Sequence, residues 1–89
     1  MTQIRTIADL SGVVRARRQA LGLTQAMLAA RAGVSRKWLV DLEGSKASIE
    51  IGLLLRVLDA LDLALQATQS AQDDSASDLD RLLETYRRG

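Results

Sequence analysis

Apolar side chains recur every three or four residues through the first two thirds of the chain, a spacing typical of helices that bury one face. The pattern separates into four stretches, so we expect four helices, at residues 7–20, 25–31, 36–43 and 49–61. On the first helix, the buried face should contain Leu10, Val13, Val14 and Leu21. On the fourth helix, it should contain Ile51, Leu54, Leu55, Leu58 and Leu61.

Residues that begin and end helices flank these four stretches. Side chains suited to capping a helix N-terminus precede them, namely Thr6 (with Asp9 three residues later), Thr24, Ser35 and Ser48. Glycines that can close a helix follow the first three stretches, namely Gly22, Gly33 and Gly44. Because the caps, the glycines and the apolar spacing agree, the sequence predicts a compact all-α domain of four to five helices.

The last third of the chain has a different character. Residues 63–68, LALQAT, alternate apolar with polar or small residues, which favours a short strand, with coil or continued helix as the alternative. Residues 69–77 are polar and are typical of a linker, whereas residues 78–88 have a helical apolar stripe made of Leu79, Leu82, Leu83 and Tyr86. We therefore expect one domain over residues 1–69, followed by an acidic linker and an amphipathic tail helix over residues 70–89.

The composition excludes several kinds of chemistry. The chain has no cysteine and no histidine, so it cannot form disulfides, Cys/His zinc sites or nucleophilic sites with a histidine base. We expect no catalytic residue, no metal, no cofactor and no enzymatic activity. No apolar run reaches the roughly 18–20 residues of a membrane span, and residues 1–10 lack the apolar core of a signal peptide. We therefore expect a cytoplasmic protein without membrane contact.

Charge is distributed unevenly along the chain. Residues 1–69 contain nine basic and six acidic side chains, a balance of +3, whereas residues 70–89 contain three basic and five acidic ones, a balance of −2. A basic domain suits a polyanionic partner, although the solubility of an ordinary surface explains the same balance.

The segment 25–44, QAMLAARAGVSRKWLVDLEG, meets the physical needs of a helix-turn-helix unit. Two helices that cross closely need a small residue at the crossing, and Ala29 supplies it. The tight turn needs a residue that tolerates positive φ, and Gly33 supplies it, followed by Val34 as an apolar anchor. The remaining inward-facing positions are apolar at helical spacing, namely Leu28, Ala32, Leu39 and Leu42. Together these residues predict a helix-turn-helix whose second helix enters the major groove of DNA.

Residues 15–63 resemble the Cro/repressor-type, or XRE, helix-turn-helix family, through ARRQALGLTQ, LAARAGVS and LEGS followed by LLLRVLDAL. The resemblance implies a lambda-repressor-like fold. The opening IADLSGVVRARRQALGLTQ and the ending LDLALQAT are most similar to antitoxins of the HipB type. Such antitoxins are dimeric repressors that also bind a kinase-like toxin, so the resemblance implies a homodimer on a palindromic operator in double-stranded DNA.

The resemblance also implies roles for individual residues. Gln25 matches the family position that binds a DNA phosphate, and Arg18 and Glu43 match a pair that forms an internal salt bridge. The residues expected to face DNA from the recognition helix and the segment after it are Ser35, Arg36, Lys37, Trp38, Val40, Asp41 and Lys46. Arginine and lysine suit guanine, aspartate suits the cytosine amino group, and valine suits the thymine methyl group.

Some of these residues have a second interpretation. Partial burial against the first helix is the alternative for Trp38. The basic residues outside the recognition helix are expected either to contact DNA phosphates or to be ordinary solvated charges. They are Arg15, Arg17, Lys46 and Arg56.

The strand at residues 63–68 is expected to pair across the two-fold axis of the dimer, through Leu63, Leu65 and Ala67. The tail at residues 78–88 either folds back on its own domain or binds a protein partner such as a toxin. Three functions remain open from the sequence. The chain is an antitoxin that represses its own promoter, a stand-alone regulator of the same family, or a protein-interaction module that does not bind DNA.

Overall fold

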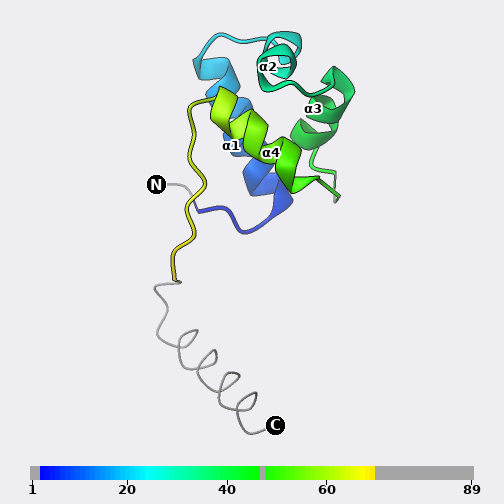
Figure 1. Cartoon of the computed structure of the whole chain (residues 1–89). Coiled ribbons are helices and arrows are strands. Elements are labelled where there is room, and N and C mark those ends of the chain that lie inside the picture. Colours follow the sequence, from blue (N-terminus) through cyan, green and yellow to red (C-terminus); the bar gives the residue numbers. More distant parts are fainter. Residues whose placement is uncertain (1–2, 47, 70–89) are drawn as a thin grey trace, which may run out of the picture.

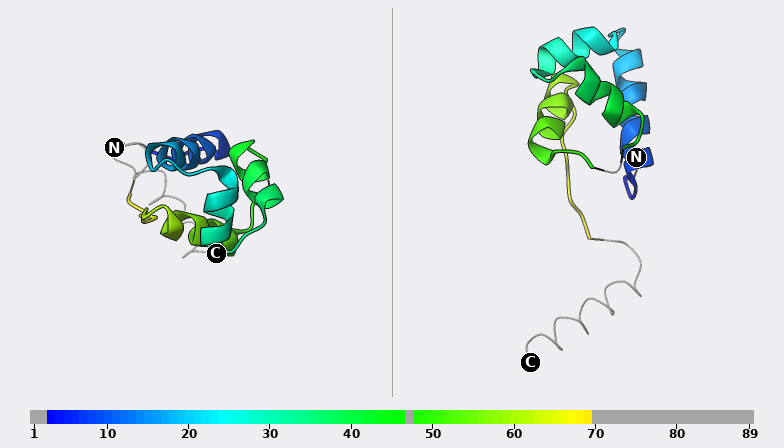
Figure 2. Two further views of the ribbon diagram at one scale, coloured as in Figure 1. Left: turned by 90° about the horizontal axis from the view of Figure 1, so that it is seen from above. Right: turned by 90° about the vertical axis from the view of Figure 1, so that its right-hand side faces the viewer.

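A computed structural model describes residues 3–46 and 48–69 of the chain. Over these residues the chain forms four helices, α1 (Ile7–Ala20), α2 (Gln25–Ala32), α3 (Arg36–Glu43) and α4 (Ile51–Ala60), and no strand (Figure 1). Helix α2 packs against both α3 and α4, and α1 packs against α3. Both views in Figure 2 place α1 and α4 on opposite sides of the domain. The all-α fold class is confirmed, and the predicted tail helix at residues 78–88 lies outside the described residues.

Three of the four predicted N-caps are present. Thr6 forms a capping box, in which its hydroxyl accepts from the Asp9 backbone N–H at 3.1 Å and the Asp9 carboxylate accepts from the Thr6 backbone N–H at 3.2 Å. The Asp9 carboxylate also accepts from the Arg5 backbone N–H at 2.9 Å, and this bond, with the one from the Thr6 backbone N–H, lowers the pKa of Asp9 below its ordinary value of 3.8. Thr24 and Ser35 cap α2 and α3 through one hydrogen bond each, accepted from the backbone N–H three residues later.

The fourth predicted cap is wrong. Helix α4 begins at Ile51 rather than at residue 49, and Glu50, not Ser48, occupies its N-cap position without a side-chain hydrogen bond. The backbone of Glu50 is extended, with φ −74° and ψ 121°, so the chain continues past Ser48 before the first helical turn forms. Capping by serine depends on the backbone N–H groups that follow it, and at this point the chain has not yet turned.

All four helices end in the same hydrogen-bonded turn, the Schellman motif, which requires one residue with positive φ. In each turn, the residue after the left-handed one donates its backbone N–H to the carbonyl five residues earlier. Leu23 donates to Arg18 in this way, and Lys46 donates to Asp41. The left-handed residues are Gly22 (φ 69°), Gly33 (φ 71°), Ser45 (φ 63°) and Asp62 (φ 58°). The expected closing glycines are therefore confirmed for α1 and α2.

The end of α3 departs from the expectation in one detail. Gly44 lies at the C-cap, but its φ is −86°, and the left-handed position falls one residue later, on Ser45. A Cβ atom on Gly44 would lie 3.2 Å from the Val40 carbonyl oxygen, which is tighter than ordinary contact. The glycine is thus explained by close packing against the last turn of α3 and not by its φ angle.

The core is built from the apolar faces of all four helices. The helix-turn-helix prediction is confirmed, since Ala29 is buried at the crossing of α2 and Val34 packs against the core. The largest apolar side chains with essentially no exposure are Val14, Leu28, Leu39, Leu42, Val57 and Leu61. The predicted face of α4 is partly wrong, because Val57 is buried whereas Ile51 and Leu55 are 62% and 46% exposed. Leu21, expected in the core, is likewise 43% exposed.

Residues 63–69 follow α4 as an extended chain that leaves the domain (Figure 1). Leu63 is partly buried against the core, whereas Leu65 is 57% exposed and Ala67 is exposed. A strand needs a neighbouring strand to accept its hydrogen bonds, and among the described residues of one chain none is available. The predicted strand is thus not formed within the chain, and pairing across a dimer axis remains a prediction.

Candidate nucleic-acid interface

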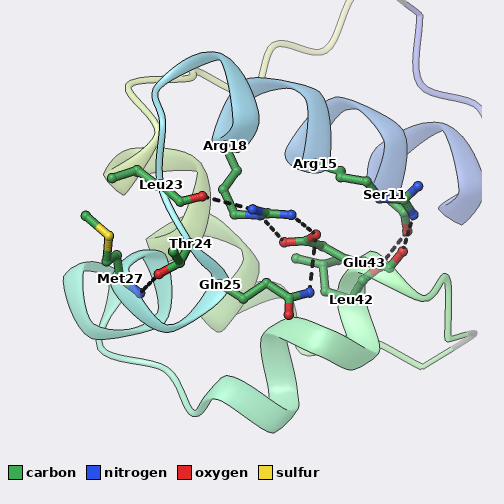
Figure 3. Close-up of polar contacts among 9 residues, drawn as sticks. All are labelled: Ser11, Arg15, Arg18, Leu23, Thr24, Gln25, Met27, Leu42 and Glu43. Atoms are coloured by element: carbon green, nitrogen blue, oxygen red, sulfur yellow. Dashed lines mark hydrogen bonds and ion pairs between the residues drawn. The ribbon is translucent and has the colours of Figure 1, made fainter.

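A buried ion pair joins the first helix to the recognition helix. The Arg18 guanidinium donates to both carboxylate oxygens of Glu43 at 2.9 Å and, through its remaining nitrogen, to the Leu23 carbonyl at 2.9 Å (Figure 3). The Glu43 side chain is only 4% exposed and that of Arg18 only 13%. A two-pronged contact of this kind fixes both side chains in direction as well as in distance. The expected internal pair is therefore present, and it sets the position of α3 against α1.

Gln25 lies at the first position of α2 and reaches the same carboxylate. Its side-chain amide donates to Glu43 Oε1 at 3.5 Å, a long hydrogen bond, and the residue stays partly exposed (Figure 3). The α2 N-terminus itself is capped by Thr24, whose hydroxyl accepts from the Met27 N–H at 3.1 Å. The N-terminal turn of a helix presents free N–H groups and a partial positive charge, which suit a phosphate.

A shallow hollow opens beside this N-terminus. Its volume is about 550 Å³, and it is lined by Arg18, Thr24, Gln25, Ala26 and Arg36. The charge of Arg18 is already paired with Glu43, so the exposed Arg36, together with the N–H groups of the α2 N-terminus, makes the hollow favour an anion. The structure thus brings Gln25 and Arg36, two of the residues expected to contact DNA, to the same place from different helices.

The exposed side of α3 contains the remaining residues of the predicted DNA-binding set. Arg36, Lys37 and Val40 are exposed. Ser35 is exposed as well, and its hydroxyl accepts from the Trp38 backbone N–H at 3.0 Å, so it also begins the helix. These residues occupy the first two turns of α3, where a helix that enters the major groove meets base edges.

Trp38 and Asp41 are only partly exposed. The Trp38 side chain packs against the hydrophobic core, in agreement with the partial burial considered from the sequence. The Asp41 carboxylate lies 3.2 Å from the Lys37 ammonium and 3.7 Å from that of Lys46. Three residues of the predicted set, Lys37, Asp41 and Lys46, therefore form one ion cluster at the end of α3.

Three arginines that the sequence left open between phosphate contact and solvated charge instead donate to backbone carbonyls. Arg15 donates to the Glu43 carbonyl at 2.7 Å, and Arg17 donates to the Leu61 carbonyl at 3.0 Å. Arg56 donates to the Gly33 carbonyl, in the turn between α2 and α3, at 3.5 Å. Carbonyls at the ends of helices have no partner within the helix, so cationic donors stabilise them.

Sequence reasoning missed one residue that holds the recognition helix. Ser11 is 1% exposed, and its hydroxyl donates to the Leu42 carbonyl near the end of α3 (Figure 3). It also lies within hydrogen-bond distance of the Ile7 carbonyl in its own helix. The signal was a small polar residue beside Leu10 and Val14 on the buried face of α1. A buried hydroxyl needs a partner, and the Leu42 carbonyl, which also accepts from the Ser45 backbone N–H, supplies it with its second lone pair.

Within residues 3–46 and 48–69, no three acidic side chains come close enough to hold a metal ion. No helix in the same part of the chain is both long and apolar enough to cross a membrane.

Comparisons with known proteins agree with this geometry. The family model for the helix-turn-helix domain matches residues 9–71. An uncharacterized HTH-type transcriptional regulator from Sinorhizobium fredii is 40% identical over 63 residues, which cover 71% of this chain and 83% of the relative. Two solved structures, a HipB–O4 20mer complex and a HipA–HipB–O2–O3 complex, each superpose with a TM-score of 0.73 at 20% identity. Each match covers 79% of this chain and 99% of the solved chain.

Proposed function

The chain belongs to the helix-turn-helix domain family and is a DNA-binding regulator of transcription; from this premise we propose that it is a sequence-specific repressor acting as a homodimer. The observation that carries the proposal is the placement of Gln25 and Arg36 around one cationic hollow, beside the exposed first turns of α3. A phosphate at the hollow would orient α3 so that its N-terminal residues face base edges.

In the proposed complex the residues divide into two roles. Gln25 and the N-terminus of α2 bind a phosphate, which positions the domain without reading sequence. Arg36 and Lys37 donate to guanine, Val40 contacts a thymine methyl group, and Asp41 accepts from a cytosine amino group. Ser35, Trp38 and Lys46 border this surface and contact the sugar–phosphate backbone.

Binding to the promoter of its own gene tests this role. A mobility-shift titration across a salt series should show selective binding that weakens as salt rises, because bound phosphates release counterions. The double variant Arg36→Ala/Lys37→Ala should lose the selectivity. Arg5→Ala is a control for the loss of one positive charge outside α3, since Arg5 is exposed before α1 and contacts Gln3. Equal, weak binding to any DNA by the wild type and the double variant would overturn the proposal.

The homodimer has its own support in the exposed apolar residues at the end of the domain. Leu65 and Ala67 project from an extended segment, and Ile51 and Leu55 are exposed one turn apart on α4. A second copy of the chain can cover these side chains and pair with the segment through backbone hydrogen bonds. Two recognition helices would then contact half-sites roughly 34–36 Å apart on a palindrome.

Sedimentation analysis of two arginine variants tests the dimer. Successive side chains of an extended segment point to opposite sides, so Leu65→Arg should disrupt the apolar contact while Gln66→Arg should leave it intact. Both variants add the same charge in the same segment, which makes them a matched pair. A Leu65→Arg variant that remains a tight dimer would show that this interface is wrong.

The antitoxin role is the finer part of the proposal. Its support is the likeness to HipB, which in one of the solved structures forms a complex with HipA. The relative from Sinorhizobium fredii, by contrast, is described only as a transcriptional regulator. A toxin encoded beside this gene, co-purifying with the chain and inhibited by it, is the expected result. Without such a neighbour the chain is a stand-alone regulator with the same DNA chemistry.

A further inference from the structure

The ion cluster at the end of α3 has an arrangement that helix stability does not explain. Lys37 precedes Asp41 by four residues, and for ion pairs on a helix the opposite order is the more stable one. Asp41 also lies near the C-terminus of α3, where the partial negative charge of the helix disfavours a carboxylate. Both features lower the stability of α3 slightly, so the position of Asp41 calls for another explanation.

The cluster is assembled by the turn that follows α3. Ser45 has a positive φ of 63°, and the chain therefore folds back so that the Lys46 backbone N–H donates to the Asp41 carbonyl at 3.1 Å. This bond returns the Lys46 side chain to the Asp41 carboxylate. Each carboxylate oxygen then faces one ammonium group, Oδ2 facing Lys37 at 3.2 Å and Oδ1 facing Lys46 at 3.7 Å.

Of the three side chains in the ion cluster, that of Asp41 is the least exposed to solvent. Asp41 is 31% exposed, whereas Lys37 and Lys46 are 83% and 64% exposed. Glu43, the other acid of α3, is buried against Arg18 and does not face this surface. Asp41 is thus the acidic group of α3 available to oppose the cations on its outer side, and it lowers the local charge of the cluster from +2 to +1.

Charge on a DNA-binding surface governs affinity for all sequences alike. Each lysine that neutralises a phosphate strengthens binding to any duplex, and a nearby carboxylate weakens it by repulsion and by competing for the lysine. A carboxylate among the base-reading residues therefore penalises binding unless a base supplies a donor for it.

We propose that Asp41 is a specificity-determining residue, whose carboxylate holds Lys37 and Lys46 away from phosphate and so limits binding to DNA of unrelated sequence. This inference rests on the proposed function, because it concerns the same DNA-binding surface. On an operator that offers a donor to Asp41, the two lysines are released, Lys37 to a guanine and Lys46 to the backbone, and the restraint is relieved.

The test compares two DNA fragments of equal length, one from the gene's own promoter and one of unrelated sequence, across a salt series. Asp41→Asn keeps the size of the side chain and removes its charge. Asp59→Asn is the matched control, because Asp59 is exposed on α4 and takes part in none of the ion pairs among the described residues. Thermal melting of both variants shows that the fold is retained.

The Asp41→Asn variant should bind the unrelated fragment about threefold to tenfold more tightly, since each surface ion pair is worth at most roughly a factor of five. Its salt dependence on that fragment should steepen by about one to two released ions. The ratio of affinities for the two fragments should fall, and Asp59→Asn should change none of these quantities appreciably.

Other outcomes separate this inference from the proposed function. If Asp41→Asn binds the unrelated fragment no more tightly than Asp59→Asn does, Asp41 does not restrain the lysines, even where the wild type is selective. If the wild type does not prefer its own promoter, the proposed function fails, while the unrelated fragment still decides the role of Asp41. A wild type that binds neither fragment overturns both.

Discussion

The chain has two parts that place their apolar side chains differently. The first part runs as far as the end of α3, and the second runs from α4 onward. In the first part the apolar residues at core spacing meet inside the domain, as Leu28 and Leu39 do, and the exposed ones are single side chains of the ordinary kind. In the second part Leu54 and Val57 are buried, but Ile51 and Leu55 form a second, exposed apolar stripe that flanks the buried face of the same helix. The first part completes its own packing, whereas the second leaves apolar surface for another chain to cover.

Polar groups show the same contrast. Up to the end of α3, buried polar side chains are paired with one another or with backbone carbonyls, as Arg18 is with Glu43 and Ser11 with Leu42. Within the described residues, no buried side-chain nitrogen or oxygen lacks a partner. From residue 63 onward the chain is extended, and its backbone groups have no partner strand in the described part of the chain. The recognition helix is thus rigidly held, and the segment after α4 is free to pair.

The largest effect on stability should come from breaking the buried ion pair between Arg18 and Glu43. Glu43→Ala leaves the Arg18 charge buried without a carboxylate, and we expect it to lower the free energy of unfolding by about 3 kcal/mol or more. Lys37→Ala, which removes one exposed ion pair, should cost no more than about 1 kcal/mol. Urea denaturation at fixed protein concentration measures both. Similar losses for the two variants would mean that the buried pair does not hold the domain.

Neighbouring leucines on α4 test the contrast within one helix. Leu54 is 4% exposed and Leu55 is 46% exposed, so Leu54→Ala should cost about 2–5 kcal/mol through lost burial and a cavity. Leu55→Ala should cost far less in the folded monomer, but it should weaken the dimer, so that more of the folded protein is monomeric and the melting temperature depends less on protein concentration. If Leu55→Ala leaves the concentration dependence unchanged, the second apolar stripe of α4 lies outside the dimer interface.

A smaller gain in stability is expected at the end of α3. Ser45 adopts a left-handed conformation that glycine adopts without strain, so Ser45→Gly should raise the free energy of unfolding by about 0.5–1 kcal/mol. Gly44→Ala is the informative partner, because its Cβ would meet the Val40 carbonyl oxygen at 3.2 Å and should lower stability. Thermal melting measures both variants. A Ser45→Gly variant that melts below the wild type would show that residue 45 does not gain from glycine, and a Gly44→Ala variant that melts above it would show that the contact with the Val40 carbonyl does not explain Gly44.

The smallest effect concerns the capping box at the start of α1. The pKa of Asp9 is lowered in the folded chain, so its carboxylate stabilises the folded state above the ordinary pKa of 3.8. That contribution should disappear as the pH falls through the lower, folded value. Asp9→Asn should therefore melt slightly below the wild type at neutral pH, and the difference should vanish in acid. A difference that persists at low pH would mean that the charge of Asp9 is not its source.

Much of the fold was predictable because its signals are local. The bounds of α1 and α3 agree with the sequence, and α2 extends one residue further, since Thr6, Thr24 and Ser35 act on backbone groups three residues away. The buried set of the helix-turn-helix unit also follows from spacing along a helix. The Arg18–Glu43 pair came from the family resemblance, because nothing in the spacing of two charges 25 residues apart indicates contact.

The start and the buried face of α4 were mispredicted for an identifiable reason. Apolar residues occur on both sides of this helix, so the pattern Ile51, Leu54, Leu55 and Leu58 fits the core in more than one rotation. Packing against the rest of the domain, chiefly against α2, selects the rotation that buries Val57 and exposes Ile51 and Leu55. Ser48 resembles a cap in sequence, but the position of the first helical turn depends on where α4 docks.

By itself, therefore, the sequence determined the helices, most of their caps, the helix-turn-helix core and the identity of the exposed residues on α3, because each depends on neighbours within about four positions. The tertiary structure alone decided which arginines bind carbonyls, where Ser11 finds its partner, how α4 is rotated and which cations surround Asp41. These features join residues distant in sequence or depend on a turn, and their energies exist only once packing has brought the groups within a few ångströms.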